Sequence, residues 1–192
     1  EDETLTATND LADEDGLGAI SYQWSRNGVA IDGATNSTLA LVQADVGKTI
    51  TVTASYTDNH GTAESVTSPA TATVTNVNDL PVVTSPLADI TPTEDAPNLD
   101  IDLAPVFHDN DPADDEAMTY AVTANSNELL VTTSVTGETL TLDFQDDQYG
   151  TANITVTAFS GLDIANDTFT VTITNVNDLP VAIAMVDTTT SL

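Results

Sequence analysis

An eight-residue sequence occurs twice in this chain of 192 residues. It reads Thr-Asn-Val-Asn-Asp-Leu-Pro-Val at residues 75–82 and again at residues 174–181, so the two copies lie 99 residues apart. A motif that returns at domain length indicates a tandem array of similar domains. Each copy follows an alternating Thr/apolar run, at residues 71–74 and 168–173, which predicts a last strand. The proline in each copy ends strand pairing and stiffens a linker.

The positions of the two copies along the chain predict the domain boundaries. A length of 192 residues suits two domains of about 100 residues each. We predict one domain over residues 1–78 and a second over residues 79–178. Residues 179–192 are interpreted as a linker and the start of a further repeat, so we expect the chain to be a piece of a longer array.

The apolar residues follow the period of a strand and not that of a helix. They alternate with Thr, Ser and Gln in several short runs, such as Tyr22 and Trp24, then Val52 and Ala54, then Leu140 and Leu142. Asn27-Gly28 between two runs is a strong hairpin signal, and Asp32-Gly33 predicts another turn. The fold class expected is all-β, with two tandem antiparallel β-sandwich domains.

The charge of the chain is strongly negative. It has 31 acidic residues against Arg26 and Lys48, a formal net charge of −29. Such a chain cannot neutralise nucleic-acid phosphates or an anionic membrane surface, so neither is expected as a partner. No apolar run is long enough for membrane insertion. The acidic residues favour divalent cations, while a salt-adapted, solvated surface remains the alternative.

The first half of the chain resembles the immunoglobulin-like repeats of giant bacterial surface adhesins, including those of the RTX type. Three stretches carry the resemblance: residues 18–24, residues 43–47 and residues 54–65. The resemblance implies that Trp24 is the buried core tryptophan and that Asp45-Val46-Gly47 forms a corner before a later strand. It also implies that the first strand of the domain is missing.

The second half resembles bacterial cadherin-like and dystroglycan-type repeats, in which calcium binds between consecutive domains. The residues that match are Thr93-Glu94-Asp95, then Asp109-Asn110-Asp111, and the two Asn-x-Asn-Asp linkers. Asp146-Asp147 is a loose match to an acidic pair, and Ser160 stands where an Asp is expected. The resemblance implies Ca²⁺ ligands at Asn76, Asn78, Asp79, Asp109, Asp111, Glu94, Asn175, Asn177 and Asp178, with help from the acids that begin the first unit.

The chemistry of these residues suits calcium. Ca²⁺ takes six to eight oxygen ligands and tolerates irregular geometry, whereas zinc prefers His and Cys. The chain has no Cys and only His60 and His108. Asp10, Asp13 and Asp15 form a further acidic loop, which is either a solvated turn or a calcium site. No catalytic motif is found, so the chain is not expected to be an enzyme.

Two functions remain open at this point. One is an extender module of a large bacterial cell-surface protein. Calcium would stiffen its linkers, and its partners would be neighbouring repeats of the same protein. The other is a carbohydrate-binding module that adheres to a polysaccharide or another cell-surface ligand in a biofilm. Most aromatic residues occupy alternating positions that would face a core, which favours the extender.

The two ends of the chain suggest a possible contact between molecules. A sandwich without its first strand has an open edge that can pair with a supplied strand. The apolar segment Val181–Asp187 of one molecule could fill that edge in another and so build head-to-tail chains. The alternative is a frayed tail and an edge protected by Glu1, Asp2 and Glu3.

Overall fold

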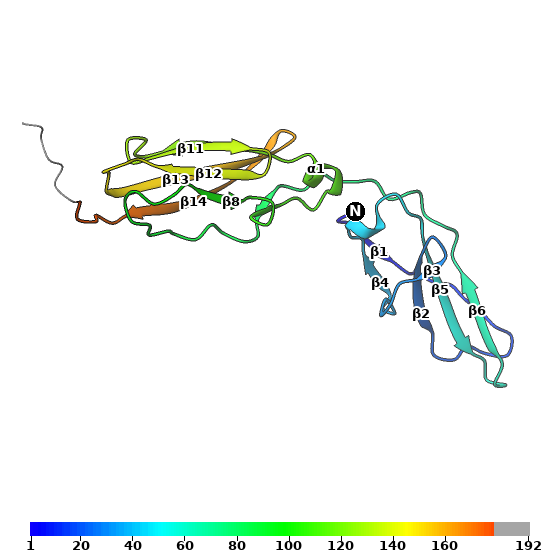
Figure 1. The fold of residues 1–192 in the computed structure, drawn as a ribbon. Coiled ribbons are helices and arrows are strands. Elements are labelled where there is room, and N and C mark those ends of the chain that lie inside the picture. Colours follow the sequence, from blue (N-terminus) through cyan, green and yellow to red (C-terminus); the bar gives the residue numbers. More distant parts are fainter. Residues whose placement is uncertain (179–192) are drawn as a thin grey trace, which may run out of the picture. The chain divides into compact units, whose positions relative to one another are not determined.

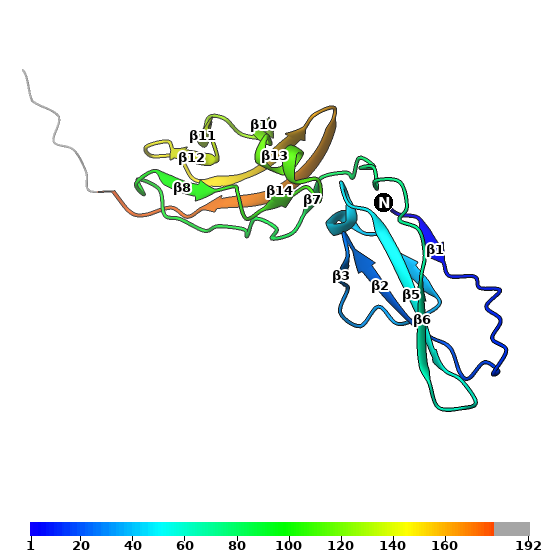
Figure 2. The same cartoon turned by 90° about the vertical axis from the view of Figure 1, so that its right-hand side faces the viewer.

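The computed structural model describes residues 1–178 and divides the chain into two compact units (Figures 1 and 2). Unit 1 comprises residues 1–79 together with residues 110–112. Unit 2 comprises residues 80–109 and the residues that follow 112. The predicted start of a further repeat at residues 179–192, with its apolar segment Val181–Asp187, lies outside the described residues. Both units are built from antiparallel strands, which confirms the predicted all-β class.

Unit 1 has a four-stranded sheet and a two-stranded sheet. The larger sheet has the order β3-β2-β5-β6, formed by Val29–Ala30, Ser21–Arg26, Ile50–Thr57 and Ala63–Thr67. The smaller sheet pairs β1 (Thr4–Thr6) with β4 (Thr38–Ala40), and a 3-10 helix, η1, covers Gln43–Asp45. Asn27 and Gly28 both have positive φ in the turn between β2 and β3, which confirms the predicted hairpin.

The core of unit 1 is small. Its buried members are Trp24, Leu41, Ile50 and Val74. Trp24 is 3% exposed, and its indole N–H donates to the Asn36 carbonyl at 2.9 Å. The tryptophan is therefore a packing residue, as the sequence predicted, and its one polar atom is satisfied.

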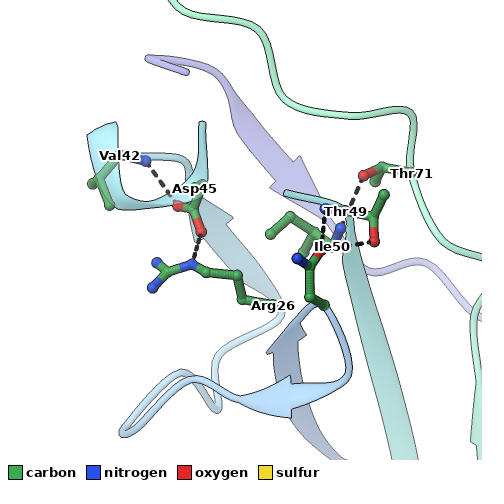
Figure 3. A network of polar contacts seen from close by, with 7 residues as sticks. Arg26, Val42, Asp45, Thr49, Ile50 and Thr71 are labelled. Atoms are coloured by element: carbon green, nitrogen blue, oxygen red, sulfur yellow. Dashed lines mark hydrogen bonds and ion pairs between the residues drawn. The ribbon is translucent and has the colours of Figure 1, made fainter. Parts of the chain in front are cut away.

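Unit 1 also contains a polar network around a buried carboxylate (Figure 3). Asp45 is fully buried in η1, where its side chain accepts the Val42 N–H at 2.9 Å and pairs with the Arg26 Nε at 2.6 Å. The corner predicted at residues 45–47 is thus fixed by an ion pair to β2. Arg26, one of the two basic residues of the chain, is therefore engaged in this ion pair.

One predicted strand is absent in unit 1. Residues 71–74 run beside β5 but do not form a regular strand, because their hydrogen bonds to β5 are irregular. The Thr71 N–H bonds the Ile50 carbonyl, whereas the Ile50 N–H bonds the hydroxyl of Thr71 in place of a backbone carbonyl. A side chain substitutes for one ladder bond, and the regular pairing is lost.

Unit 2 is a larger sandwich of two three-stranded sheets and a short strand pair. One sheet has the order β10-β13-β14, formed by Thr119–Asn125, Gly150–Ser160 and Asp163–Ile173. The other has the order β11-β12-β8, formed by Val131–Thr136, Thr139–Phe144 and Leu99–Asp102. A further pair joins β7 (Val82–Val83) to β9 (Phe107–His108).

Alternating apolar residues of β12, β13 and β14 fill the core of unit 2. Leu140, Leu142, Ile154 and Val156 are fully buried, and Phe169 is nearly so. The predicted last strand at residues 168–173 lies within β14 and is confirmed. The sequence predicted no helix, but a single turn of helix, α1, covers Pro112–Glu116. Five residues are too few to show helical periodicity in a sequence.

Candidate metal sites

Three carboxylates meet in unit 1. Glu1, Asp79 and Asp111 each offer an oxygen atom, and these atoms lie within 4.8 Å of one another. The Asp79 N–H donates to Asp111 at 2.9 Å, and the Asn110 amide donates to the Asp79 carboxylate at 2.8 Å. Glu1 and Asp111 are buried.

Asn76, Asn78 and Asp109 were also predicted as ligands, but they are not among these three carboxylates. The side chain of Asn76 accepts a hydrogen bond from Gln43 at 3.0 Å, and Asn78 donates to the Asp79 carbonyl at 2.9 Å. Asp109 belongs to unit 2, where it is buried and accepts the Ser160 hydroxyl at 2.7 Å. Ser160 therefore holds a carboxylate by a hydrogen bond, at the position where the resemblance expected an Asp.

The carboxylate group in unit 1 includes the buried Glu1. In unit 2 a buried glutamate, Glu94, makes backbone contacts of the same kind. The Glu1 carboxylate accepts the Val77 N–H at 3.0 Å, and the Glu1 amine donates to the Thr75 carbonyl at 2.8 Å. In unit 2 the Glu94 carboxylate accepts the Val176 N–H, and the Glu94 N–H donates to the Thr174 carbonyl at 2.9 Å. Each copy of the repeated motif thus makes the same two backbone contacts with a buried glutamate.

The residue after each glutamate supports this equivalence. Asp2 has a φ of 62° and Asp95 a φ of 58°, in the left-handed region that few non-glycine residues adopt. In unit 2, Glu94 also accepts the amide of Asn175 at 2.9 Å. Asn177 donates to the Asp178 carbonyl at 3.1 Å, which repeats the contact between Asn78 and Asp79.

A second carboxylate group lies in unit 2 beside Glu94. Asp95, Asp147 and Asp178 are exposed, and their oxygens lie within 4.8 Å of one another. The Asp147 N–H donates to Asp95 at 3.2 Å. Asp178 was predicted as a ligand, whereas Asp95 and Asp147 were not. The Glu94-Asp95 pair near the start of the second domain and the loose match at residues 146–147 are the signals that point to them.

A third group joins distant parts of unit 1. Asp13, Asp58 and Glu64 offer oxygens within 4.8 Å of one another, and the Tyr56 hydroxyl contacts Asp13 at 3.0 Å and Glu64 at 2.7 Å. The sequence grouped Asp13 with Asp10 and Asp15. Asp15 does contact it, through a backbone N–H at 2.8 Å, but Asp10 is not in the group.

Hydrogen bonds in this third group shift the pKa values of Asp13 and Tyr56. The Asp15 N–H donates to Asp13 and, with the smaller contribution of Tyr56, lowers the pKa of that carboxyl below its usual value. The bond to Glu64, followed by burial, raises the pKa of the Tyr56 hydroxyl. Asp13 is therefore an ionised carboxylate at neutral pH, and Tyr56 is a neutral donor.

All three groups consist of oxygen donors. Carboxylates held this close repel one another unless a cation lies between them. A hard divalent cation with flexible coordination fits such a donor set, and the absence of His and Cys from the groups argues against zinc. Asp79, Asp111 and Glu1 provide the most buried of these donor sets.

Comparison with known proteins yields matches to solved structures only. No family model and no curated protein matches the chain. Among solved structures, three extracellular repeats of mouse cadherin-23 (EC22-24) are 18% identical, with a TM-score of 0.49, over 82% of this chain and 53% of that one. Domains 3–5 of Drosophila OTK are 13% identical, with a TM-score of 0.49, over 90% and 59%.

An enzyme is also among the similar structures. An endo-fucoidan hydrolase of glycoside hydrolase family 107 is 15% identical, with a TM-score of 0.40, over 83% of this chain and 27% of that one. The chain thus spans between 27% and 59% of the length of these three chains. The assignment of the fold class therefore rests on the strands and sheets of the two units. No helix among the described residues is long and apolar enough to cross a membrane.

Proposed function

We propose that this chain is a calcium-binding extender and adhesion module of a large, repetitive bacterial cell-surface protein. The observation that carries the proposal is the group of Glu1, Asp79 and Asp111, three carboxylates whose oxygens lie within 4.8 Å of one another. Ca²⁺ bound there would neutralise their repulsion. The group includes the last residue of the Asn-Val-Asn-Asp linker, so bound calcium would restrict motion of that linker.

The repeated glutamate supports an array function. Glu1 and Glu94 make the same two backbone contacts, with a valine N–H and a threonine carbonyl of the repeated motif. A structural module repeated in this way suits a spacer whose units are joined by similar linkers. We propose that residues 1–78 and 79–178 are its separate domains and that its immediate partners are neighbouring repeats in an extracellular location.

Calcium titration tests this proposal. A ligand that binds only the folded state stabilises it by RT ln(1 + [L]/Kd), about 2.7 kcal/mol at a hundredfold excess over Kd. Millimolar CaCl₂ should therefore raise the melting temperature of unit 1 well beyond the effect of NaCl at equal ionic strength. Equal shifts from the two salts would mean simple screening and would contradict the proposal.

A pair of variants localises the site. Asp79→Asn and Asp111→Asn should each reduce the heat of calcium binding in a calorimetric titration, because each removes one anionic ligand. Asp32→Asn removes the same charge from an exposed turn and is the matched control. If all three variants lose the same amount of binding, the effect belongs to net charge and not to this site.

Carbohydrate binding is the second candidate. A groove of about 460 Å³ lies between β10 and β11 and is lined by polar groups that include Asn125, Glu128 and Thr133. Its tyrosine, Tyr120, is only partly exposed and packs against Phe107 with ring centroids 5.8 Å apart. A glycan array should show binding that Asn125→Ala weakens; absence of any bound glycan leaves the extender alone.

A further inference from the structure

The two basic residues of the chain line the same groove in unit 1. Arg26 and Lys48 are the only Lys or Arg in a sequence that has 31 acidic residues. The groove lies at the hairpin of β2 and β3 and has a volume of about 350 Å³. Its lining comprises Arg26, Asn27, Val29, Ala30, Ile31, Asp32 and Lys48. All the positive charge of Lys and Arg thus gathers in one place, which favours an anionic ligand there.

Arg26 is oriented by the carboxylate behind it. Its Nε donates to the fully buried Asp45 at 2.6 Å, while the Arg26 side chain remains 29% exposed. Figure 3 shows the two terminal nitrogens of Arg26 pointing away from this contact, and among the described residues neither of them donates a hydrogen bond. The end of a guanidinium presents parallel N–H groups that match the two oxygens of a carboxylate. Arg26 is therefore held on one side and able to donate on the other.

Lys48 and Asn27 provide further donors in the groove. Lys48 is exposed, and within residues 1–178 its ammonium group forms no ion pair. Its backbone is fixed by the N–H, which donates to the Asp45 carbonyl at 2.9 Å. The side-chain oxygen of Asn27 accepts the Thr49 N–H at 2.8 Å, which leaves the Asn27 amide nitrogen to donate to a ligand. Because the buried Asp45 offsets the charge of Arg26, the attraction for an anion comes mainly from Lys48.

The rest of the groove suits the body of a sugar. Val29 on β3 is 71% exposed, and Ala30 and Ile31 continue this apolar wall. Asp32 follows in the turn and is exposed, so its carboxylate can accept hydroxyl groups. A sugar ring offers both surfaces, because it has C–H groups on its faces and hydroxyls around its edge. The volume lies at the small end of the range for ligand pockets, about 300–1,000 Å³, which suits a short saccharide better than a folded partner.

We propose that this groove binds a uronate, a sugar residue that carries a carboxylate, within an acidic saccharide. The uronate carboxylate accepts from the terminal nitrogens of Arg26 and from the Lys48 ammonium. Its ring lies against Val29, and one of its hydroxyls donates to Asp32. An acidic peptide fits less well, because Asp32 repels a run of carboxylates.

The acidic surface elsewhere does not prevent this binding. Charges more than about 8 Å apart are largely screened at physiological ionic strength, so the residues of the groove decide the affinity. The site shares no residue with the carboxylates proposed to bind calcium or with the groove between β10 and β11. Uronate binding is therefore a separate function, and it does not require calcium.

The test is an NMR titration with a trisaccharide of galacturonic acid, in chelator so that calcium cannot bridge the sugar to other carboxylates. The amide signals of Asn27, Val29 and Ile31 should shift at millimolar saccharide, and those of unit 2 should not. The neutral trisaccharide of galactose should bind about tenfold more weakly, since it lacks the carboxylate. Absence of any shift in unit 1 overturns the proposal, as does equal binding of the neutral sugar. Tighter binding of a hexaglutamate peptide overturns the sugar as the occupant.

Variants of Lys48 separate this site from the effect of net charge. Lys48→Gln should weaken binding of the acidic trisaccharide about fivefold, whereas Lys48→Arg keeps the charge and should retain most of the affinity. Gln148→Glu makes the same change in net charge at an exposed position of unit 2 and should leave the affinity unchanged. Trp24 fluorescence checks that unit 1 remains folded in each variant. Unchanged affinity in folded Lys48→Gln overturns the assignment of the groove, as does an equal loss in Gln148→Glu.

Discussion

The two units use the same sandwich plan with very different cores. Among residues 1–178, the buried apolar cluster of unit 2 has 17 members and that of unit 1 has four. Unit 1 also has buried or half-buried polar contacts, such as the pair between Arg26 and Asp45 and the Thr71 hydroxyl that replaces a ladder acceptor. The comparison shows that a repeated motif can join units whose stabilising interactions differ in kind.

The largest expected effect is that of Trp24→Ala on unit 1. Truncation of a buried tryptophan costs about 3–5 kcal/mol, a large part of the stability of a small domain. Unit 1 should unfold or melt far earlier, while unit 2 remains folded. NMR amide signals of each unit, followed through urea unfolding, measure the two transitions separately.

Leu142→Ala is the matched change in unit 2. It should lower the stability of unit 2 by about 2–5 kcal/mol and leave unit 1 unaffected, since its neighbours belong to the larger cluster. If Trp24→Ala lowers the midpoint of unit 2 as much as that of unit 1, the units do not unfold independently and the comparison fails.

Arg26→Ala should have the next largest effect. It leaves the fully buried Asp45 carboxylate without its cation, at a cost of about 2–4 kcal/mol. Trp24 is the only tryptophan, so its fluorescence in urea follows unit 1 alone. Lys48→Ala removes the same charge from an exposed position and should stay within about 0.5 kcal/mol. Similar losses in both variants would assign the effect to net charge.

Thr71→Val should have a smaller effect. It removes the hydroxyl that accepts the Ile50 N–H at 3.0 Å, so stability should fall by about 1 kcal/mol. Thr170→Val in β14 removes a hydroxyl that donates to the Asn153 side chain, and the ladder there is made by the backbone. The second variant should change stability by less than about 0.5 kcal/mol. Equal losses would show that the side-chain bond is not special to unit 1.

The smallest expected effect is a shift in tyrosine titration. The hydrogen bond to Glu64 raises the pKa of Tyr56, so this tyrosine should ionise late in an alkaline absorbance titration. A raised folded pKa means that the stabilisation is complete below the unfolded value of about 10 and is lost as pH rises through the folded value. Glu64→Gln should bring the late step to lower pH. In unit 2 the pKa of Tyr120 is raised chiefly by burial, so its step should not move.

The sequence by itself predicted the elements that depend on near neighbours. The alternation around Trp24, Leu142 and Phe169 predicts strands, because side chains two residues apart share a face. Asn27-Gly28 predicts a hairpin, because both residues tolerate positive φ. The predicted last strand at residues 71–74 was wrong in unit 1, since a threonine hydroxyl can replace a ladder carbonyl and no local pattern reveals it.

Only the tertiary structure decided which acids meet. Asp13 lies near Asp10 and Asp15 in sequence, yet its carboxylate partners are Asp58 and Glu64, which the pairing of β5 with β6 brings to it. Glu1, Asp79 and Asp111 are separated by dozens of residues and meet because the segment before β1, the linker and the loop before α1 converge. Such convergence follows from strand register and chain crossings, and those are set by packing of the whole unit.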